Sequence, residues 1–227
     1  PIDVSISFGY ETKNNENQNI EEIFKSAEDN MYKKKLFEGS KMRVVAIKSI
    51  IDTLYKRNNK EEKHSHRVSQ LCSSMGEILS LSSQEIEQLR STGLLHDIGK
   101  IAINDSVLSK SGKLTDNEWK EIKRHCEIGY RILSTVNDLS DIAEYVLAHH
   151  ERWDGKGYPR GLKGTEIPFV SRIISIANAY DVMTSDGSYR GLLSEKAAIL
   201  ELQKNAGIKF DPYLVSIFVE KVLAKKH

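Results

Sequence analysis

The pattern of apolar and polar residues changes early in the chain from the period of a strand to that of a helix. Apolar residues occupy every second position over 2–8, which is typical of a half-buried strand ending at Gly9. After a polar loop, apolar residues recur at helical spacing over 20–31 and lead into the basic run at 33–35. One strand and one helix bury too little surface to form a core alone, so this segment needs a partner.

Beyond residue 40 the apolar pattern is helical throughout. Residues 41–55 carry an apolar stripe that predicts a connecting helix, and residues 58–60 interrupt it. Further helices are expected at 62–80, 83–97, 115–135, 139–150, 168–185, 194–205 and 212–225. The expected caps are Ser82 with Glu85, Thr115 with Glu118, and Ser194, while Pro168 and Pro212 fit first turns. The fold class is therefore predicted to be mainly α.

Length and composition narrow the class of protein. A chain of 227 residues holds one domain of about 100–200 residues and a fragment of another. Its net charge of +1 argues against binding to a nucleic acid polymer through bulk charge. The apolar runs are short, so we expect no membrane span or export signal. Cys72 and Cys126 form no Cys-x-x-Cys pair, which fits a reducing cytoplasm.

The histidines suggest a metal site. Six of the seven lie on four predicted helices: His64, His66, His96, His125, His149 and His150. His96 and Asp97 sit inside an apolar segment, where unpaired polar groups would cost several kcal/mol. Adjacent positions on a helix diverge by about 100°, so His149 and His150 cannot easily chelate one ion side by side, but each could serve a different ion of a pair. Imidazole with carboxylate suits zinc, manganese or iron.

Any one of these histidines could instead be exposed or hydrogen-bonded in the core. For His66, only two residues from His64 and on another helix face, we keep that interpretation. The joint set favours a metal site, because separate helices would have to bring all of its members together.

Two motifs in this set resemble the HD superfamily of metal-dependent phosphohydrolases and, more narrowly, its HD-GYP branch. Residues 149–159 read HHERWDGKGYP and are similar to the branch signature HHExxDGxGYP. Residues 95–100 read LHDIGK, and His64 opens an HSxRV segment as in the family. The resemblance spans about residues 61–227 and implies an HD-superfamily helical bundle.

The resemblance also implies roles for individual residues. The metal ligands would be His64, His96, Asp97, His125, His149, His150 and, in a later helix, Asn178. Asp97 would bridge two divalent transition-metal ions, iron or manganese, and Lys100 would neutralise a phosphate oxygen. The register of a glutamate that holds a third metal in some members falls on Lys60, which favours two ions. The substrate-binding candidates are Lys100, Arg152, Tyr158, Asp181, Tyr189 and Arg190.

Two positions depart from the family pattern. Asn178 stands where the family has an aspartate, so it brings a carbonyl oxygen without a negative charge and should weaken metal binding. Gly187 stands where the family uses an arginine on the nucleotide phosphates. Such a charge-assisted hydrogen bond is worth about 1.5–3 kcal/mol. Arg190 keeps the second basic position.

The N-terminal segment resembles the C-terminal edge of a GGDEF domain. The resemblance rests on the SISFG strand at 5–9 and the run AEDNMYKKK at 27–35. It implies a remnant of an α/β domain at 1–38, a connecting helix at 39–60 and the HD-GYP domain at 61–227. The cyclase signature loop is not in this chain, and the segment could alternatively be a cap of the following domain.

The function that the resemblance implies is hydrolysis of cyclic di-GMP to pGpG or GMP in the bacterial cytoplasm. A GGDEF-domain protein and a second copy of the chain are further candidate partners, with no role for membranes. Asn178 and Gly187 favour an alternative, a degenerate domain that senses nucleotide or binds proteins. A phosphohydrolase for another nucleotide is the third reading.

Overall fold

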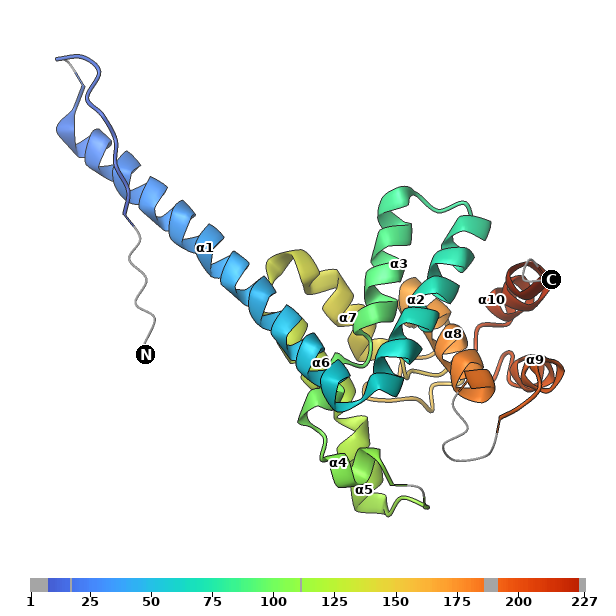
Figure 1. Ribbon diagram of the computed structural model, residues 1–227. Helices are drawn as coiled ribbons and strands as arrows, with labels where there is room; N and C mark the ends of the chain where they lie inside the picture. Colours follow the sequence, from blue (N-terminus) through green and yellow to red (C-terminus); the bar gives the residue numbers. More distant parts are fainter. Residues whose placement is uncertain (1–7, 17, 111, 186–191, 225–227) are drawn as a thin grey trace. The chain divides into compact units, whose positions relative to one another are not determined.

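The computed structural model describes residues 8–16, 18–110, 112–185 and 192–224. The chain divides into a first unit, residues 1–49, and a second, residues 50–227. Within the described residues the regular elements are helices (Figure 1). The strand expected at 2–8 falls almost wholly on residues outside that description.

A single long helix, α1 (Ile20–Arg57), replaces the two helices expected at 20–35 and 41–55. The intervening segment contains no proline, and its one glycine, Gly39, costs only about 1 kcal/mol in a helix interior. Glu21 and Glu22 in the first turn and Lys56 and Arg57 in the last complement the helix dipole. The helix therefore continues through the expected gap.

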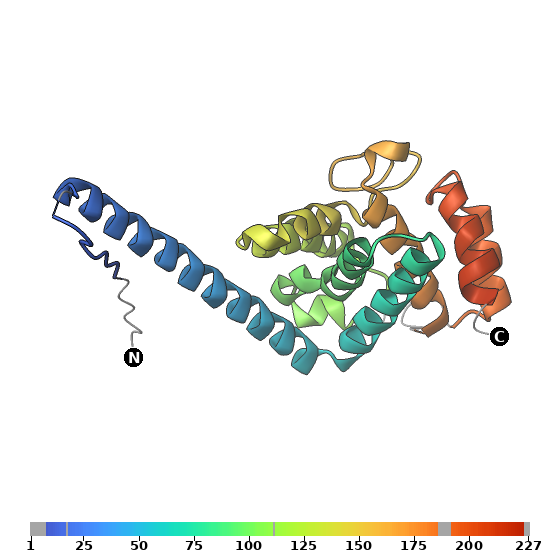
Figure 2. The same cartoon turned by 90° about the horizontal axis from the view of Figure 1, so that it is seen from above.

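The second unit is a helical bundle, as its periodicity predicts. Its longer helices are α2 (Asn59–Ile78), α3 (Ser83–Leu95), α5 (Asp116–Lys123), α6 (His125–Leu133), α7 (Ser140–Ala148), α8 (Phe169–Ser185), α9 (Glu195–Lys204) and α10 (Pro212–Ile217). Helix α2 packs along α3 and also against α8, while α6 packs against α7 (Figures 1 and 2). The capping boxes at Ser82 and Thr115 and the cap at Ser194 are confirmed.

The remaining elements are short, and of these η4 lies within the helix expected at 212–225. They are η1 (Ile98–Ala102), α4 (Asp105–Leu108), η2 (Asn137–Leu139), η3 (Gly164–Glu166) and the π-helical η4 (Phe218–Leu223). The helix expected at 115–135 is broken at Arg124, whose N–H bonds back to the Glu121 carbonyl. At the break η1 comes very close, because a Cβ on Gly99 would lie 2.0 Å from the His125 carbonyl oxygen.

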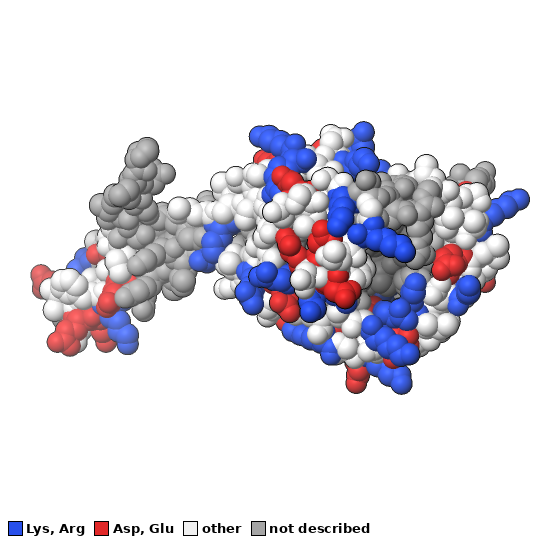
Figure 3. Space-filling view, turned by 90° about the horizontal axis from the view of Figure 1, so that it is seen from below, with Lys and Arg blue, Asp and Glu red and all other residues white. Residues whose placement is uncertain are grey.

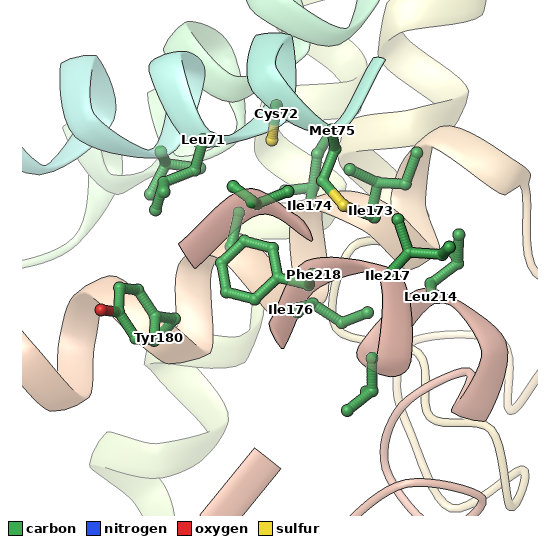
Figure 4. Packing of buried hydrophobic residues seen from close by; sticks show 14 of the residues in the cluster. Leu71, Cys72, Met75, Ile173, Ile174, Ile176, Tyr180, Leu214, Ile217 and Phe218 are labelled. Carbon is green, nitrogen blue, oxygen red and sulfur yellow. The ribbon is translucent and has the colours of Figure 1, made fainter. Parts of the chain in front are cut away.

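The hydrophobic core lies between α2, α8 and α10 (Figure 4). Met75 of α2, Ile174 of α8 and Leu214 of α10 are fully buried there. Phe218 packs edge-on against Tyr180, with ring centroids 5.4 Å apart. Burying a side chain of this size contributes about 1.5–3 kcal/mol, so the core fixes α2 and α8, both of which carry predicted site residues.

The described part of the chain has no helix that combines the length and the apolar character needed to span a bilayer. On the face drawn in Figure 3, basic and acidic side chains are interspersed, in keeping with the net charge of +1.

The packing around Phe218 generates a stability prediction. Phe218→Ala should lower the free energy of unfolding by about 3–5 kcal/mol, because it leaves a cavity in the core. The measurement is denaturant unfolding followed by circular dichroism. Tyr213→Ala is the control, since Tyr213 is 62% exposed on α10, the helix that directly precedes η4. Equal losses in the two variants would contradict this account of the core.

Candidate metal centre

The Asp97 carboxylate lies between two sets of imidazoles. Asp97 follows His96, the C-cap of α3, and directly precedes η1. Oδ2 is 3.1 Å from Nε2 of His96 and 3.8 Å from Nε2 of His64. Oδ1 is 3.2 Å from Nε2 of His125 and 4.0 Å from Nε2 of His149. Side chains from distant parts of the sequence therefore converge on one buried carboxylate.

The potential ligand atoms form two groups, each within 4.8 Å. One contains His64, His96 and Asp97, and the other contains His125, Cys126, His149 and His150. His149 and His150 both lie in the second group, and their service to different ions stays a prediction. Helix α7 ends at Ala148, so the 100° divergence of neighbouring helical positions does not apply to them.

The buried polar atoms of this centre fit a cation. Nε2 of His96 and Oδ1 of Asp97 are buried and make no hydrogen bond among the described residues. The Nδ1 atoms of His96, His125 and His149 each lie beside a backbone carbonyl three residues earlier, at 2.8, 2.6 and 2.5 Å. Donation from Nδ1 to a carbonyl leaves the Nε2 lone pair free toward Asp97, an arrangement found around metal-binding histidines.

The protonation states of the side chains in this centre also fit a bound metal cation. Burial lowers the pKa of His125, His149 and His150, which keeps these rings in the neutral form that binds metals. Burial opposes ionisation of Asp97, but His96 and Lys100 outweigh it and hold the pKa of Asp97 well below its usual range. Neutral nitrogen and anionic oxygen donors suit iron, manganese or zinc. Burial raises the pKa of Cys126, so its thiol is a poorer ligand.

Lys100 is held between two carboxylates. Its Nζ is 2.7 Å from Oδ2 of Asp97 and 3.0 and 3.1 Å from the two oxygens of Glu61. Burial raises the pKa of Glu61 to about 7, although the Lys100 ammonium opposes that shift. Burial disfavours the charge on Lys100, but Asp97 and Glu61 outweigh it and raise the pKa of Lys100.

Sequence reasoning missed Glu61 at this site. It considered the position four residues before His64, which is Lys60, and set Glu61 aside. Residues three apart on a helix also share a face, so the spacing of Glu61 to His64 was a usable signal. Glu61 is 8% exposed and enters the site from α2, while Lys60 is exposed.

Asp181 supports a predicted ligand. Its Oδ2 lies 2.7 Å from Nδ1 of His64, and Arg67 donates to its two oxygens at 2.6 and 2.9 Å. Asp181 is buried and its carboxylate is occupied by these partners, so its role in this structure is to hold His64, and a contact with substrate stays a prediction. Asn178 lies one turn earlier on α8, and its side chain makes no hydrogen bond to the described members of the centre.

The loop after His150 is fastened by Glu151. This buried carboxylate accepts the backbone N–H groups of Arg160, Gly161 and Leu162 at 2.6, 3.1 and 3.0 Å. Gly157 passes so close to the start of the loop that a Cβ would lie 2.4 Å from the Arg152 nitrogen. The glutamate was part of the motif, but its anchoring role was not foreseen.

Among the remaining predicted substrate-binding residues, the structure describes Arg152 and Tyr158. Arg152 forms an ion pair with Asp154 at 3.0 and 2.6 Å, and its contact with a nucleotide stays a prediction. Tyr158 stacks on His150, with ring centroids 4.9 Å apart and planes 24° from parallel. Gly187, Tyr189 and Arg190 lie outside the described residues.

Comparison with known proteins supplies a family match and curated relatives. A family model described as "HD domain" matches residues 48–214. A cyclic di-GMP phosphodiesterase of Thermotoga maritima is 39% identical over 166 residues, 72% of this chain and 45% of that protein. A 3'3'-cGAMP-specific phosphodiesterase 2 of Vibrio cholerae is 34% identical, covering 82% of this chain and 35% of that protein. The chain thus spans less than half the length of these relatives.

Solved structures share the fold. A cyclic GMP-AMP-specific phosphodiesterase of V. cholerae aligns with a TM-score of 0.56 and 24% identity, over 72% of this chain and 44% of that one. An HDG"Y"P protein of Bdellovibrio bacteriovorus aligns with a TM-score of 0.61 and 16% identity, over 93% and 75% of the two chains.

The contact between Asp181 and His64 generates a prediction for metal binding. Asp181→Asn should lower metal affinity about 10–100-fold, because it removes the carboxylate that orients His64. Competition with a chelator measures the affinity, and thermal unfolding reports whether the fold is kept. Asp138→Asn, an exposed change on η2, is the control. Unchanged affinity in a folded Asp181 variant would refute this role.

Proposed function

Since the chain belongs to the HD domain family, we propose that it is a metal-dependent phosphodiesterase of the HD-GYP type that hydrolyses cyclic di-GMP to pGpG or GMP. The observation that carries the proposal is the buried Asp97 carboxylate between two imidazole groups, with unpaired donor and acceptor atoms. The HHExxDGxGYP signature and the names of the curated relatives support the same reaction class.

The proposed ligands are His64, His96 and Asp97 in one group and His125, His149 and His150 in the other, with Asp97 shared. Bound divalent cations supply Lewis-acid stabilisation of phosphoryl oxygens and activation of a water molecule. Two ions, iron or manganese, fit the two groups of nitrogen and carboxylate donors. Asn178 would add a neutral oxygen at the edge of this set.

The chain's own residues have separable tasks in this proposal. Lys100 holds a positive charge beside Asp97, where it can neutralise a phosphate oxygen, and Glu61 keeps that ammonium in place. Asp181 orients His64, while Glu151 fastens the loop that carries Tyr158. Tyr189 and Arg190 remain sequence-based candidates for phosphate contacts.

A second substrate is 3'3'-cGAMP. Three curated V. cholerae relatives named as phosphodiesterases specific for that molecule are 34–41% identical to this chain. Both molecules are 3'-5' linked cyclic dinucleotides and would present the same phosphodiester to the centre. Parallel hydrolysis assays with the two substrates distinguish them.

The remaining expectations concern the chain's organisation. We propose a GGDEF-like remnant at 1–38, a connector at 39–60 and the HD-GYP domain at 61–227, with α1 running across the first boundary. A GGDEF-domain partner, a homodimer and a cytoplasmic location also stay predictions.

The central test removes the shared carboxylate. Asp97→Ala should lose at least one metal and all measurable turnover of cyclic di-GMP, because both ligand groups depend on that side chain. Protein purified without oxygen is analysed for metal and then assayed with cyclic di-GMP. Asp141→Ala, at an exposed position on α7, is the control. A metal-free wild-type protein without hydrolase activity, or an Asp97 variant with full turnover, would overturn the proposal.

The two departures from the family pattern give a gain-of-function test. Asn178→Asp should raise metal occupancy by adding a negative charge, and Gly187→Arg should lower KM about tenfold or more by adding a phosphate contact. The double variant should gain more activity than either single one, since both metal and phosphate must be held. Higher metal occupancy with no cleavage even by the double variant would favour the binding-module alternative.

A further inference from the structure

Two side chains of α5 continue the metal centre outward. Tyr158 stacks on His150, and the Nζ of Lys123 lies 5.0 Å from the centroid of the Tyr158 ring. The same Nζ is 6.0 Å from the centroid of Trp119, one helical turn earlier. A line of contacts thus runs from a proposed ligand through Tyr158 and Lys123 to Trp119.

Packing does not account for a tryptophan at this position. Trp119 is 49% exposed, and α5 contributes no buried residue to the bundle. The other tryptophan, Trp153, lies beneath the guanidinium of Arg172, 5.9 Å from its ring. Trp119 therefore offers a large aromatic surface that the fold does not use.

A tryptophan beside a lysine fits a nucleobase. Stacking of a base on an aromatic side chain stabilises binding without reading its identity. A lysine ammonium donates well to O6 and N7 of guanine, whereas adenine presents an amino donor in place of O6. The pair therefore has the chemistry to hold a purine and to prefer guanine.

We propose that Trp119 and Lys123 form a platform that binds one guanine base of the substrate. The inference rests on the proposed function, because a cyclic dinucleotide carries its bases beside the phosphodiester that the metal centre would receive. Trp119 supplies the stacking face and Lys123 the hydrogen-bond donor, between Trp119 and Tyr158. The platform determines affinity and base preference, while the chemistry stays at Asp97 and its neighbours.

The experiment uses the fact that the chain has two tryptophans. In manganese-loaded Trp153→Phe protein, the tryptophan emission comes from Trp119 alone. The probe is the bis-phosphorothioate analogue of cyclic di-GMP, which resists hydrolysis, and calorimetry measures its binding independently. We expect saturable quenching of Trp119 emission with the same dissociation constant as calorimetry gives.

Substitutions then separate stacking from hydrogen bonding. Trp119→Ala should weaken binding of the analogue about 5- to 150-fold, and Trp119→Phe should recover most of the loss. Lys123→Met should reduce the preference for this analogue over its cyclic di-AMP counterpart by about 5- to 150-fold. Lys120→Met is the matched control, because Lys120 is on the same helix but lines a different cavity with Ala102 and Ile103. In hydrolysis assays, Trp119→Ala should raise KM and leave kcat unchanged.

Two results would overturn the platform. One is an unchanged dissociation constant in Trp119→Ala, and the other is binding by calorimetry without any change in Trp119 emission. Either result leaves the phosphodiesterase proposal intact, because the wild-type chain still binds the analogue. Failure of the wild-type chain to bind or to cleave cyclic di-GMP would instead overturn both proposals.

Discussion

The buried Asp97 carboxylate is the constraint on which the rest of the structure depends. An ionised carboxylate in a protein interior costs several kcal/mol unless charged or hydrogen-bonding groups surround it. Here Lys100 lies 2.7 Å away, and imidazole nitrogens face both of its oxygens. The fold must therefore deliver side chains from α2, α6 and the end of α7 to one point at the end of α3.

Two kinds of packing meet that requirement. On one side, the core between α2, α8 and α10 fixes the helices that carry His64 and Asp181. On the other side, η1 lies against the start of α6 at Gly99, where any side chain would collide with the His125 carbonyl. Close backbone approach at that point sets the distance between Asp97 and His125. A larger residue at Gly99 would disturb the centre without touching any ligand.

Sequence reasoning predicted what local pattern determines. Helical periodicity and capping boxes located most helices of the bundle, and the motifs identified the histidines and Asp97 that converge. It could not give the features that tertiary contacts determine. The grouping of His149 with His150 depends on where α7 ends, and the partners of Asp181 depend on how α8 meets α2. Trp119 belongs to none of the recognised sequence motifs, so its proposed role rests on its position beside Lys123 and Tyr158.

The charges around the centre explain why Glu61 belongs to it. Lys100 lies against Oδ2 of Asp97, the same oxygen that faces His64 and His96. That oxygen cannot serve the ammonium fully and a cation held by those two histidines as well. Glu61 offers Lys100 a second carboxylate at 3.0 Å, so the ammonium would keep a partner if Asp97 ligated a metal. Lys100 would then remain at the edge of the centre, in the position from which the proposed function has it neutralise a phosphate oxygen.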